Sequence, residues 1–419
     1  MAVRRAREWG DLNMAIEQVT ALINGQTYTL IYDPAFRAYK AAVTLEESSA
    51  SQPEGYYNAE ITAVNDAGVS VSTDGGNLPG LRLVVKDLTP PALTLVSPPE
   101  GYLNTASPSV VADVTDQHSG VDISTLTVTA DGTEVSASTE PIERGFRVTA
   151  TPVLVDGLHT LTFSVADLDG NTGKLTVRYQ VDTAPPVLTV HNHRTVVDVS
   201  AQVLRGQALD AAAPVMVTIT RGTYSETAEA KADGSYACTA PLNVGENTFT
   251  LTATDAAGNV STQSVWGMRL ITDRTKSDLD RLKSLLKKPV NTWTEEELEM
   301  VWTGMARGSY DFSDLNRVGT AAEYLSEELR RYGYYAPVIS KTDYQRTDAP
   351  QKPEMESYLR NVYNINNAAP TQQLLPSSMK NLGLNEANQI EAALVAVDAV
   401  FPRLRTTYLY SGEAFSGEF

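Results

Sequence analysis

Apolar and polar side chains alternate along two stretches of the chain that align without a gap, Gly157–Asn171 and Gly245–Asn259. The apolar positions are Leu161, Phe163 and Val165 in the first stretch and Phe249, Leu251 and Ala253 in the second. A period of two marks a half-buried strand, and the Asp and Gly-Asn that close both stretches favour a turn. A shorter copy, Asn58–Gly68, places Ile61 where Phe163 falls. The pattern predicts a β domain that occurs three times, each with a late strand and its hairpin.

Pro-Pro pairs separate the predicted β domains. Asp87-Leu-Thr-Pro-Pro and Asp182-Thr-Ala-Pro-Pro each precede a new alternating stretch. Two prolines remove hydrogen-bond donors and stiffen the chain, so we expect consecutive domains to be held apart. The predicted divisions are an N-terminal arm at 1–11 and β domains at 12–88, 89–183 and 184–271.

The apolar spacing changes to that of helices after Arg269. One helical face carries Leu279, Leu282, Leu285 and Leu286. Thr292 or Thr294 followed by acids is typical of a second helix start. Further helices are expected at 313–332, ended by Gly333, and at 353–367 and 384–401. The sequence predicts a helical C-terminal module at 272–404 and an extended tail rich in aromatic residues and glycine at 405–419.

The Pro-Pro segments together with the closing Asp-x-x-Gly-Asn strands resemble the bacterial immunoglobulin-like repeats of surface proteins and phage tail proteins. The resemblance covers 89–271 well and 12–88 weakly. It implies a multidomain fold class, with three tandem all-β immunoglobulin-like sandwiches followed by a small, mainly α bundle and its tail. Such sandwiches host many unrelated binding roles, so the resemblance specifies the fold rather than the function.

Several separated motifs of the C-terminal module carry a second resemblance. They are Asp273–Asp278, Trp302, Tyr310–Gly319, Tyr324–Leu325, Thr342–Tyr344, Tyr358–Val362, Asn385–Glu391 and Tyr408–Glu418. Together they are similar to the C-terminal module of structural tail proteins from phages and prophages of gut Firmicutes. This resemblance implies attachment to a tail or baseplate, and it names no catalytic residue.

Composition and charge narrow the choice of partners. With 42% hydrophobic and 20% charged residues the chain can fold, and 33 basic against 51 acidic side chains give a net charge of −18. An acidic surface repels polyanions, so we expect no nucleic acid partner. The single Cys238, in an alternating stretch, is predicted to lie in a strand core and leaves no intrachain disulfide. We find no signal-peptide core and no apolar run long enough for a membrane span, which favours synthesis in the bacterial cytoplasm.

Two groups of residues invite a metal interpretation. Asp167, Asp169 and Asn171 have the spacing of a calcium-loop start, but the distal glutamate of that loop is missing, which favours a plain turn. His191 and His193 are predicted on one face of a strand, but no acid is adjacent in sequence, which favours a surface or linker-facing pair over a metal site. No nucleophile motif or phosphate-binding glycine loop occurs. We therefore expect no enzyme, no resident metal and no cofactor.

Aromatic residues near both ends of the chain are the assembly candidates. They are Trp9, Tyr408, Tyr410, Phe415 and Phe419. One interpretation is that the tail aromatics, together with Tyr332, Tyr334 and Tyr335, fill the core of the helical bundle. The other is that the tail is an extended arm whose aromatic residues anchor it on a neighbouring subunit. Trp9, close to Arg4, Arg5 and Arg7, lies in a docking arm or in a frayed end.

The resemblance to tail proteins implies a non-enzymatic virion protein of a phage tail or baseplate, which docks on the particle and projects its immunoglobulin-like domains. The expected partners are other tail or baseplate proteins, further copies of this chain, and a host-surface glycan or protein. The alternatives are a bacterial cell-surface adhesin and a tail enzyme that degrades cell wall or polysaccharide. The docking end, copy number and type of particle stay open.

Overall fold

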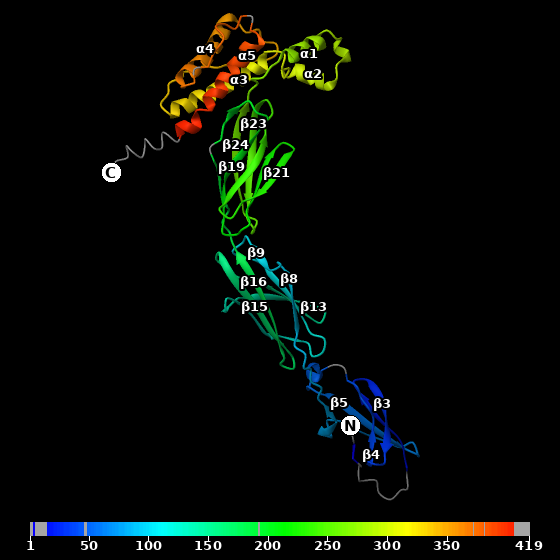
Figure 1. Cartoon of the computed structure of the whole chain (residues 1–419). Coiled ribbons are helices and arrows are strands. Elements are labelled where there is room, and N and C mark those ends of the chain that lie inside the picture. The colour runs from blue at the N-terminus through cyan, green and yellow to red at the C-terminus, as the bar shows by residue number, and fades with distance from the viewer. Residues whose placement is uncertain are drawn as a thin grey trace, which may run out of the picture. The chain divides into compact units, whose positions relative to one another are not determined.

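The computed structural model describes residues 3–4, 15–45, 48–191, 193–371, 373–380 and 382–405. The chain forms two compact units, Met1–Thr183 and Ala184–Phe419. The first unit holds two β domains, and the second holds a third β domain followed by a helical module (Figure 1). The predicted fold class of several immunoglobulin-like sandwiches followed by helices is confirmed.

Domain 1 is built on strands in the order β1-β4-β3-β2-β5-β6, with β7 beside β5. The strands are β1 (Val3–Arg4), β2 (Ile16–Ile23), β3 (Gln26–Asp33), β4 (Ala38–Lys40), β5 (Tyr57–Asn65), β6 (Ser70–Thr73) and β7 (Arg82–Leu83). Alternate side chains of β2 and β5, among them Val19, Ala21, Ala59 and Ile61, form its core. The alternation expected for Asn58–Gly68 is confirmed.

Domain 2 consists of a four-stranded sheet, β13-β14-β10-β8, and a five-stranded sheet, β12-β11-β15-β16-β9. The strands are β8 (Ala92–Ser97), β9 (Gly101–Leu103), β10 (Val110–Thr115), β11 (Val121–Ala130), β12 (Thr133–Glu134), β13 (Ala137–Ile142), β14 (Gly145–Ala150), β15 (Gly157–Asp167) and β16 (Thr172–Val181). Phe163 and Tyr179 are fully buried in its core. The predicted late hairpin is β15–β16.

Domain 3 repeats this topology with sheets β17-β19-β22 and β18-β24-β23-β20-β21. The strands are β17 (Val187–Val190), β18 (Val196–Val197), β19 (Ala201–Leu209), β20 (Met216–Arg221), β21 (Tyr224–Glu229), β22 (Ser235–Pro241), β23 (Gly245–Thr254) and β24 (Val260–Arg269). In both domains a short early strand, β9 or β18, runs parallel to the last one. Cys238 is fully buried, as predicted.

The sequence-based prediction for the two histidines is wrong. Strand β17 ends at Val190, so His191 and His193 follow the strand instead of sharing one of its faces. His193 is half-buried, and this burial lowers the pKa of its imidazole.

The helical module contains five helices between residues 276 and 398 of the described chain. They are α1 (Lys276–Leu286), α2 (Glu295–Trp302), α3 (Phe312–Arg331), α4 (Lys352–Ala368) and α5 (Leu384–Asp398). The Thr294 hydroxyl accepts a hydrogen bond from the Glu297 amide, and the Glu297 carboxylate accepts one from the Thr294 amide. Helix α2 therefore begins with a capping box. Gly333 has a φ of +80° and ends α3, as its sequence position predicts.

Helices α3, α4 and α5 lie side by side and share one hydrophobic core (Figure 1). Tyr332 and Tyr334 pack against this core, whereas the Tyr335 side chain is 84% exposed. Among the residues described, no helix is both long and apolar enough to cross a lipid bilayer.

Candidate functional site

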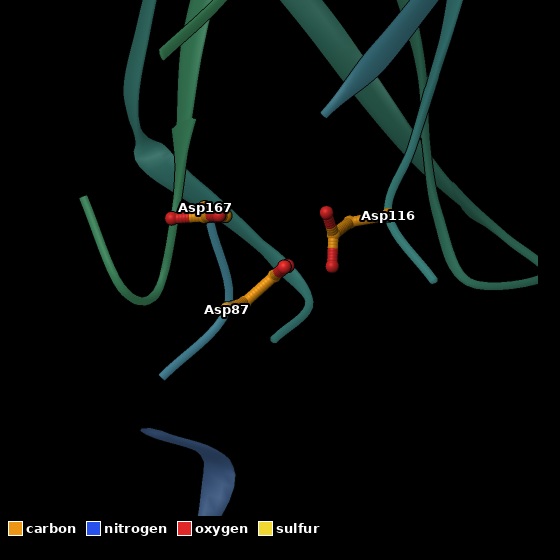
Figure 2. A group of neighbouring side chains, drawn as sticks. All are labelled: Asp87, Asp116 and Asp167. Carbon is orange, nitrogen blue, oxygen red and sulfur yellow. The ribbon is translucent and has the colours of Figure 1, made fainter. Parts of the chain in front are cut away.

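Three aspartates gather where domain 1 passes into domain 2. Asp87 lies in the linker after β7, Asp116 follows β10, and Asp167 ends β15 (Figure 2). One carboxylate oxygen of each lies within 4.8 Å of the others. All three residues are buried, with 8%, 6% and 2% of their surfaces exposed. This carboxylate cluster is the first candidate site.

Local hydrogen bonds shape the two loops of domain 2 that carry Asp116 and Asp167. The amides of His118 and Gly120 donate to Asp116 Oδ1 at 3.0 and 2.7 Å. The Asn171 amide donates to Asp167 Oδ1 at 2.8 Å, and its side-chain Nδ2 donates to Asp167 Oδ2 at 2.7 Å. An aspartate that accepts from amides further along its own loop stabilises the turn, so each carboxylate is fixed in place by its own sequence.

Asp87 is ordered by both the linker and domain 2. The Thr89 amide donates to its Oδ1 at 2.8 Å, and the Ser119 hydroxyl donates to its Oδ2 at 3.2 Å. Burial by itself raises the pKa of Asp87, but these hydrogen bonds outweigh burial and hold the pKa below its ordinary value. Asp87 therefore stays ionised close to two other carboxylates.

Asp167, Asp169 and Asn171, the weak calcium candidates of the sequence, have separate roles here. Asp167 belongs to the cluster, but Asp169 Oδ2 accepts from the Asp87 amide at 2.9 Å and from the Ser48 hydroxyl. Asn171 Nδ2 donates to the Asp87 carbonyl at 3.0 Å. Asp169 and Asn171 thus fasten the linker onto domain 2, and the Pro-Pro pair does not hold the two domains out of contact as we had expected.

The donor chemistry of the cluster suits a hard divalent cation. Buried like charges at this separation repel one another, and a cation among them relieves that repulsion. Calcium prefers carboxylate and carbonyl oxygens and takes about six to eight of them. Asp87, Asp116 and Asp167 could supply the charged ligands, with carbonyl groups or water completing the set. Sequence reasoning missed Asp87 and Asp116, although an aspartate also precedes the second Pro-Pro pair and another follows an early strand of domain 3.

Domain 3 contains the same pair of aspartate loops. Asp210 follows β19 and its Oδ1 accepts from the Ala212 amide at 2.8 Å. Asp255 follows β23, and Asn259 donates to it through its amide and its side chain, both at 2.9 Å. The two loops are therefore a repeated feature of the domain type.

A second candidate site is the seat of the helical module on domain 3. Val196, Met268 and Leu270 of domain 3 belong to the same buried cluster as the inner faces of α3, α4 and α5. The rings of Trp266 and Tyr324 lie 5.1 Å apart across this contact. The last sandwich and the helices therefore share one continuous core.

Four charged side chains are buried beside this core, with at most 5% of any residue's surface exposed. Arg274 Nη2 lies 2.6 Å from Asp314 Oδ1 and 2.5 Å from Glu391 Oε1. Arg317 Nη2 also contacts both acids, at 2.9 Å from Glu391 Oε1. Two positive and two negative charges compensate each other, which is the condition for burying ions without a large penalty.

The charged network also holds the chain segment that leaves domain 3. Glu391 Oε2 accepts from the Ile271 amide at 2.7 Å, and Asn388 Oδ1 accepts from the Arg274 amide at 3.0 Å. Helix α5 thus fixes the segment between β24 and α1 through its own side chains.

Asp398, at the end of α5, makes a further link to domain 3. Its Oδ1 accepts from the Thr195 amide at 3.2 Å, and its Oδ2 lies 3.4 Å from Arg194 Nε. Burial raises the pKa of Asp398 to about 6, although the hydrogen bonds and the Arg194 charge act to lower it. The strength of this link therefore depends on pH.

The assembly candidates Trp9, Tyr408, Tyr410, Phe415 and Phe419 lie outside the described residues. Their roles stay predictions.

Comparisons with known proteins agree with the fold of domain 3. Residues 195–272 match the model of a bacterial Ig-like domain family, and no curated protein matches the chain. The match covers one of the several Ig-like β-sandwich domains of this chain, and such a fold by itself does not specify a function.

Several solved structures are similar to parts of the chain. The fibronectin(III)-like modules of Clostridium thermocellum CbhA share 15% identity at a TM-score of 0.31, over 42% of this chain and 94% of that one. A tetra-tandem repeat from the extending region of a large adhesion protein shares 23% sequence identity at a TM-score of 0.27, and the match covers 62% of this chain and 68% of that one. The Yersinia pseudotuberculosis adhesin InvE shares 19% sequence identity at a TM-score of 0.19, and the match covers 42% of this chain and 58% of that one. Identities and TM-scores this low carry no argument about what this chain does.

Proposed function

We propose that this chain is a non-catalytic structural protein of a phage tail or baseplate. In this proposal the helical module docks on the particle and the Ig-like domains project from it. Its partners are other tail or baseplate proteins and further copies of the same chain. Weak contacts of the repeated domains with a host-surface glycan or protein add to one another when several copies are displayed.

The observation that carries the proposal is the seat of the helical module on domain 3. A docking module must be joined firmly to the domains that project from the particle. Here the shared core with its buried ion pairs joins the helices to the last sandwich without a flexible linker. Tethered binding or catalytic modules usually connect through exposed, mobile segments instead. The separated motifs between Asp273 and Glu418, which resemble tail proteins, point in the same direction.

The charged groups of the second unit also favour a structural role over catalysis. Asp314, Glu391 and Asp398 are buried and engaged with arginines, so they have no access to a substrate. A general acid or base needs a substrate proton within hydrogen-bond reach.

Particle fractionation tests this proposal. Lysates of the source bacterium, after prophage induction, are separated on a density gradient, and peptides of this chain are quantified in each fraction. We expect the chain to migrate with tailed particles, where cryo-electron microscopy should locate its helical module against the tail or baseplate. Recovery only with the cell envelope would contradict the virion role and favour the adhesin.

A further inference from the structure

The helical module has an open groove at the N-terminal end of α3. It encloses about 540 Å³, within the usual range of ligand pockets. Two methionines are among its apolar lining residues, which include Phe312, Leu315, Met355, Met379 and Leu382, and polar groups expose at least as much of the lining surface. Methionine side chains adapt to the shape of a partner and make favourable contacts with aromatic rings. This Met-aromatic groove suits a short peptide segment with aromatic anchors.

The rim of the groove adds a positive charge. The Arg346 guanidinium stacks 3.9 Å from the ring centroid of Trp302, whose side chain is 64% exposed. The two acids on the rim are already engaged. Asp348 pairs with Lys341 at 3.1 Å, and Asp311 caps α3 by accepting from the Ser313 amide. None of the ion pairs formed within the described part of the chain includes Arg346, which leaves it available for an acidic group of a ligand.

The chain itself contains a segment with the matching chemistry. Residues 406–419, outside the described part, read Thr-Thr-Tyr-Leu-Tyr-Ser-Gly-Glu-Ala-Phe-Ser-Gly-Glu-Phe. Four aromatic residues and a leucine could fill the groove, and Glu413 and Glu418 could meet Arg346. We propose that the segment Tyr408–Phe419 of one chain docks in the Met-aromatic groove of a second copy.

Reach decides between the groove of the same chain and that of another copy. Arg405, the last described residue, contacts Tyr332 at the C-terminal end of α3, whereas the groove lies at its N-terminal end. A helix of 20 residues spans about 30 Å. A fully extended chain carries Tyr408 about 11 Å and Tyr410 about 18 Å from Arg405. Tyr408 and Tyr410 therefore fall short of the groove of their own chain, whereas Phe415 and Phe419, about 33 Å or more along an extended chain, do not. A tail whose tyrosines contact a groove needs the groove of a partner copy.

This inference does not depend on the virion role, because self-association is measured on the purified full-length chain. Sedimentation velocity of the wild-type chain should show a larger species that grows with concentration. Replacing Tyr408, Tyr410, Phe415 and Phe419 together with serine should leave a monomer. A wild-type chain that stays monomeric, or an assembly that survives the serine replacements, would overturn the proposal.

A labelled peptide of residues 406–419 then tests the groove directly. It should bind the full-length serine-replaced chain, and the added Met379→Asp substitution should weaken binding about tenfold, the usual effect of losing a contact to an aromatic anchor. The control Leu374→Asp lies at a 76% exposed position between α4 and α5 that does not line the groove. Because Met379 also packs against the helical core, the circular dichroism of Met379→Asp must match that of the parent chain. Equal weakening of peptide binding by both substitutions, or no binding to the serine-replaced parent chain, would show that the groove is not the receptor.

The charge on the rim is tested with Arg346→Glu. This substitution should weaken binding of the acidic peptide, and it should not weaken binding of a peptide that carries Glu413→Lys and Glu418→Lys.

Discussion

The chain joins domains in two different ways, and the contrast lies in what is buried at each junction. Between domains 1 and 2 the contacts are hydrogen bonds around a cluster of three like-charged carboxylates. Between domain 3 and the helices the contact is an apolar core with balanced ion pairs. Polar contacts of the first kind respond to a bound cation, whereas a shared core separates only at the cost of exposing apolar surface. We therefore expect an adjustable first junction and a permanent second one.

The largest effect should follow from unbalancing the buried charges of the second junction. Glu391→Gln leaves Arg274 and Arg317 facing a single acid, and breaking a buried pair costs about 3–5 kcal/mol of unfolding free energy. Urea unfolding followed by the fluorescence of Trp266, which lies in the seat, measures this loss. The control Glu327→Gln removes an exposed partner of Arg330 and should change little. Equal effects of both substitutions would contradict a structural role for the network.

The apolar part of the same junction should matter almost as much. Leu270→Ala removes a side chain of which 1% is exposed, and we expect a loss of about 3 kcal/mol from the cavity it leaves. Calorimetry should show this loss in the transition of the second unit alone. Leu158→Ala, on the exposed face of β15 in domain 2, serves as the matched truncation and should leave both transitions in place. A loss confined to the helices, with domain 3 unaffected, would contradict the shared core.

Asp398 should make the second junction weaker as the pH rises. Its folded-state pKa of about 6 lies above the ordinary aspartate value of 3.8, so the folded chain binds more protons between these two values. The contribution of Asp398 to stability is therefore greatest below about pH 4 and falls as the pH rises through 6, by about 2–3 kcal/mol. Asp398→Asn should remove this pH-dependent contribution, so the profiles of unfolding free energy against pH of the wild type and the variant should differ in slope between about pH 4 and 6. Parallel profiles of the wild type and the variant would show that Asp398 titrates normally.

The smallest effect should come from calcium at the first junction. A free calcium concentration about tenfold above its Kd stabilises a binding-competent fold by about 1.4 kcal/mol, visible as a rise in the Tm of the first unit. Asp116→Asn should abolish the rise, whereas Asp122→Asn, in which a loop aspartate outside the cluster is neutralised, should preserve it. An equal rise in Tm for the wild type, Asp116→Asn and Asp122→Asn would show that calcium does not bind at this cluster.

The repeated parts of the molecule could be predicted from sequence because each follows a local rule. Alternation locates β15 and β23, and Thr294 with Glu297 marks the start of α2. His191 and His193 misled the prediction because alternation cannot show where a short strand stops.

The two sites could not be predicted, because each joins residues that are distant in sequence. Asp87, Asp116 and Asp167 meet only after the linker returns to domain 2, and each alone is typical of a turn. Glu391 and Asp398 stand on the buried stripe of α5 beside Ile390, Leu394 and Val397. An acid within an apolar stripe was a signal that we could have used, but its arginine partners come from other segments.

Hydrogen exchange measured by mass spectrometry tests most directly whether domain 3 and the helical module form one unit. Under conditions where exchange reports opening equilibria, we expect the amides of β24 and α5 to open with the same free energy, because exposing the seat disrupts both elements. Glu391→Gln should lower both values together. Exchange of α5 at a much lower free energy than β24 would contradict this coupling, and would show that the helical module opens while the sandwich stays folded.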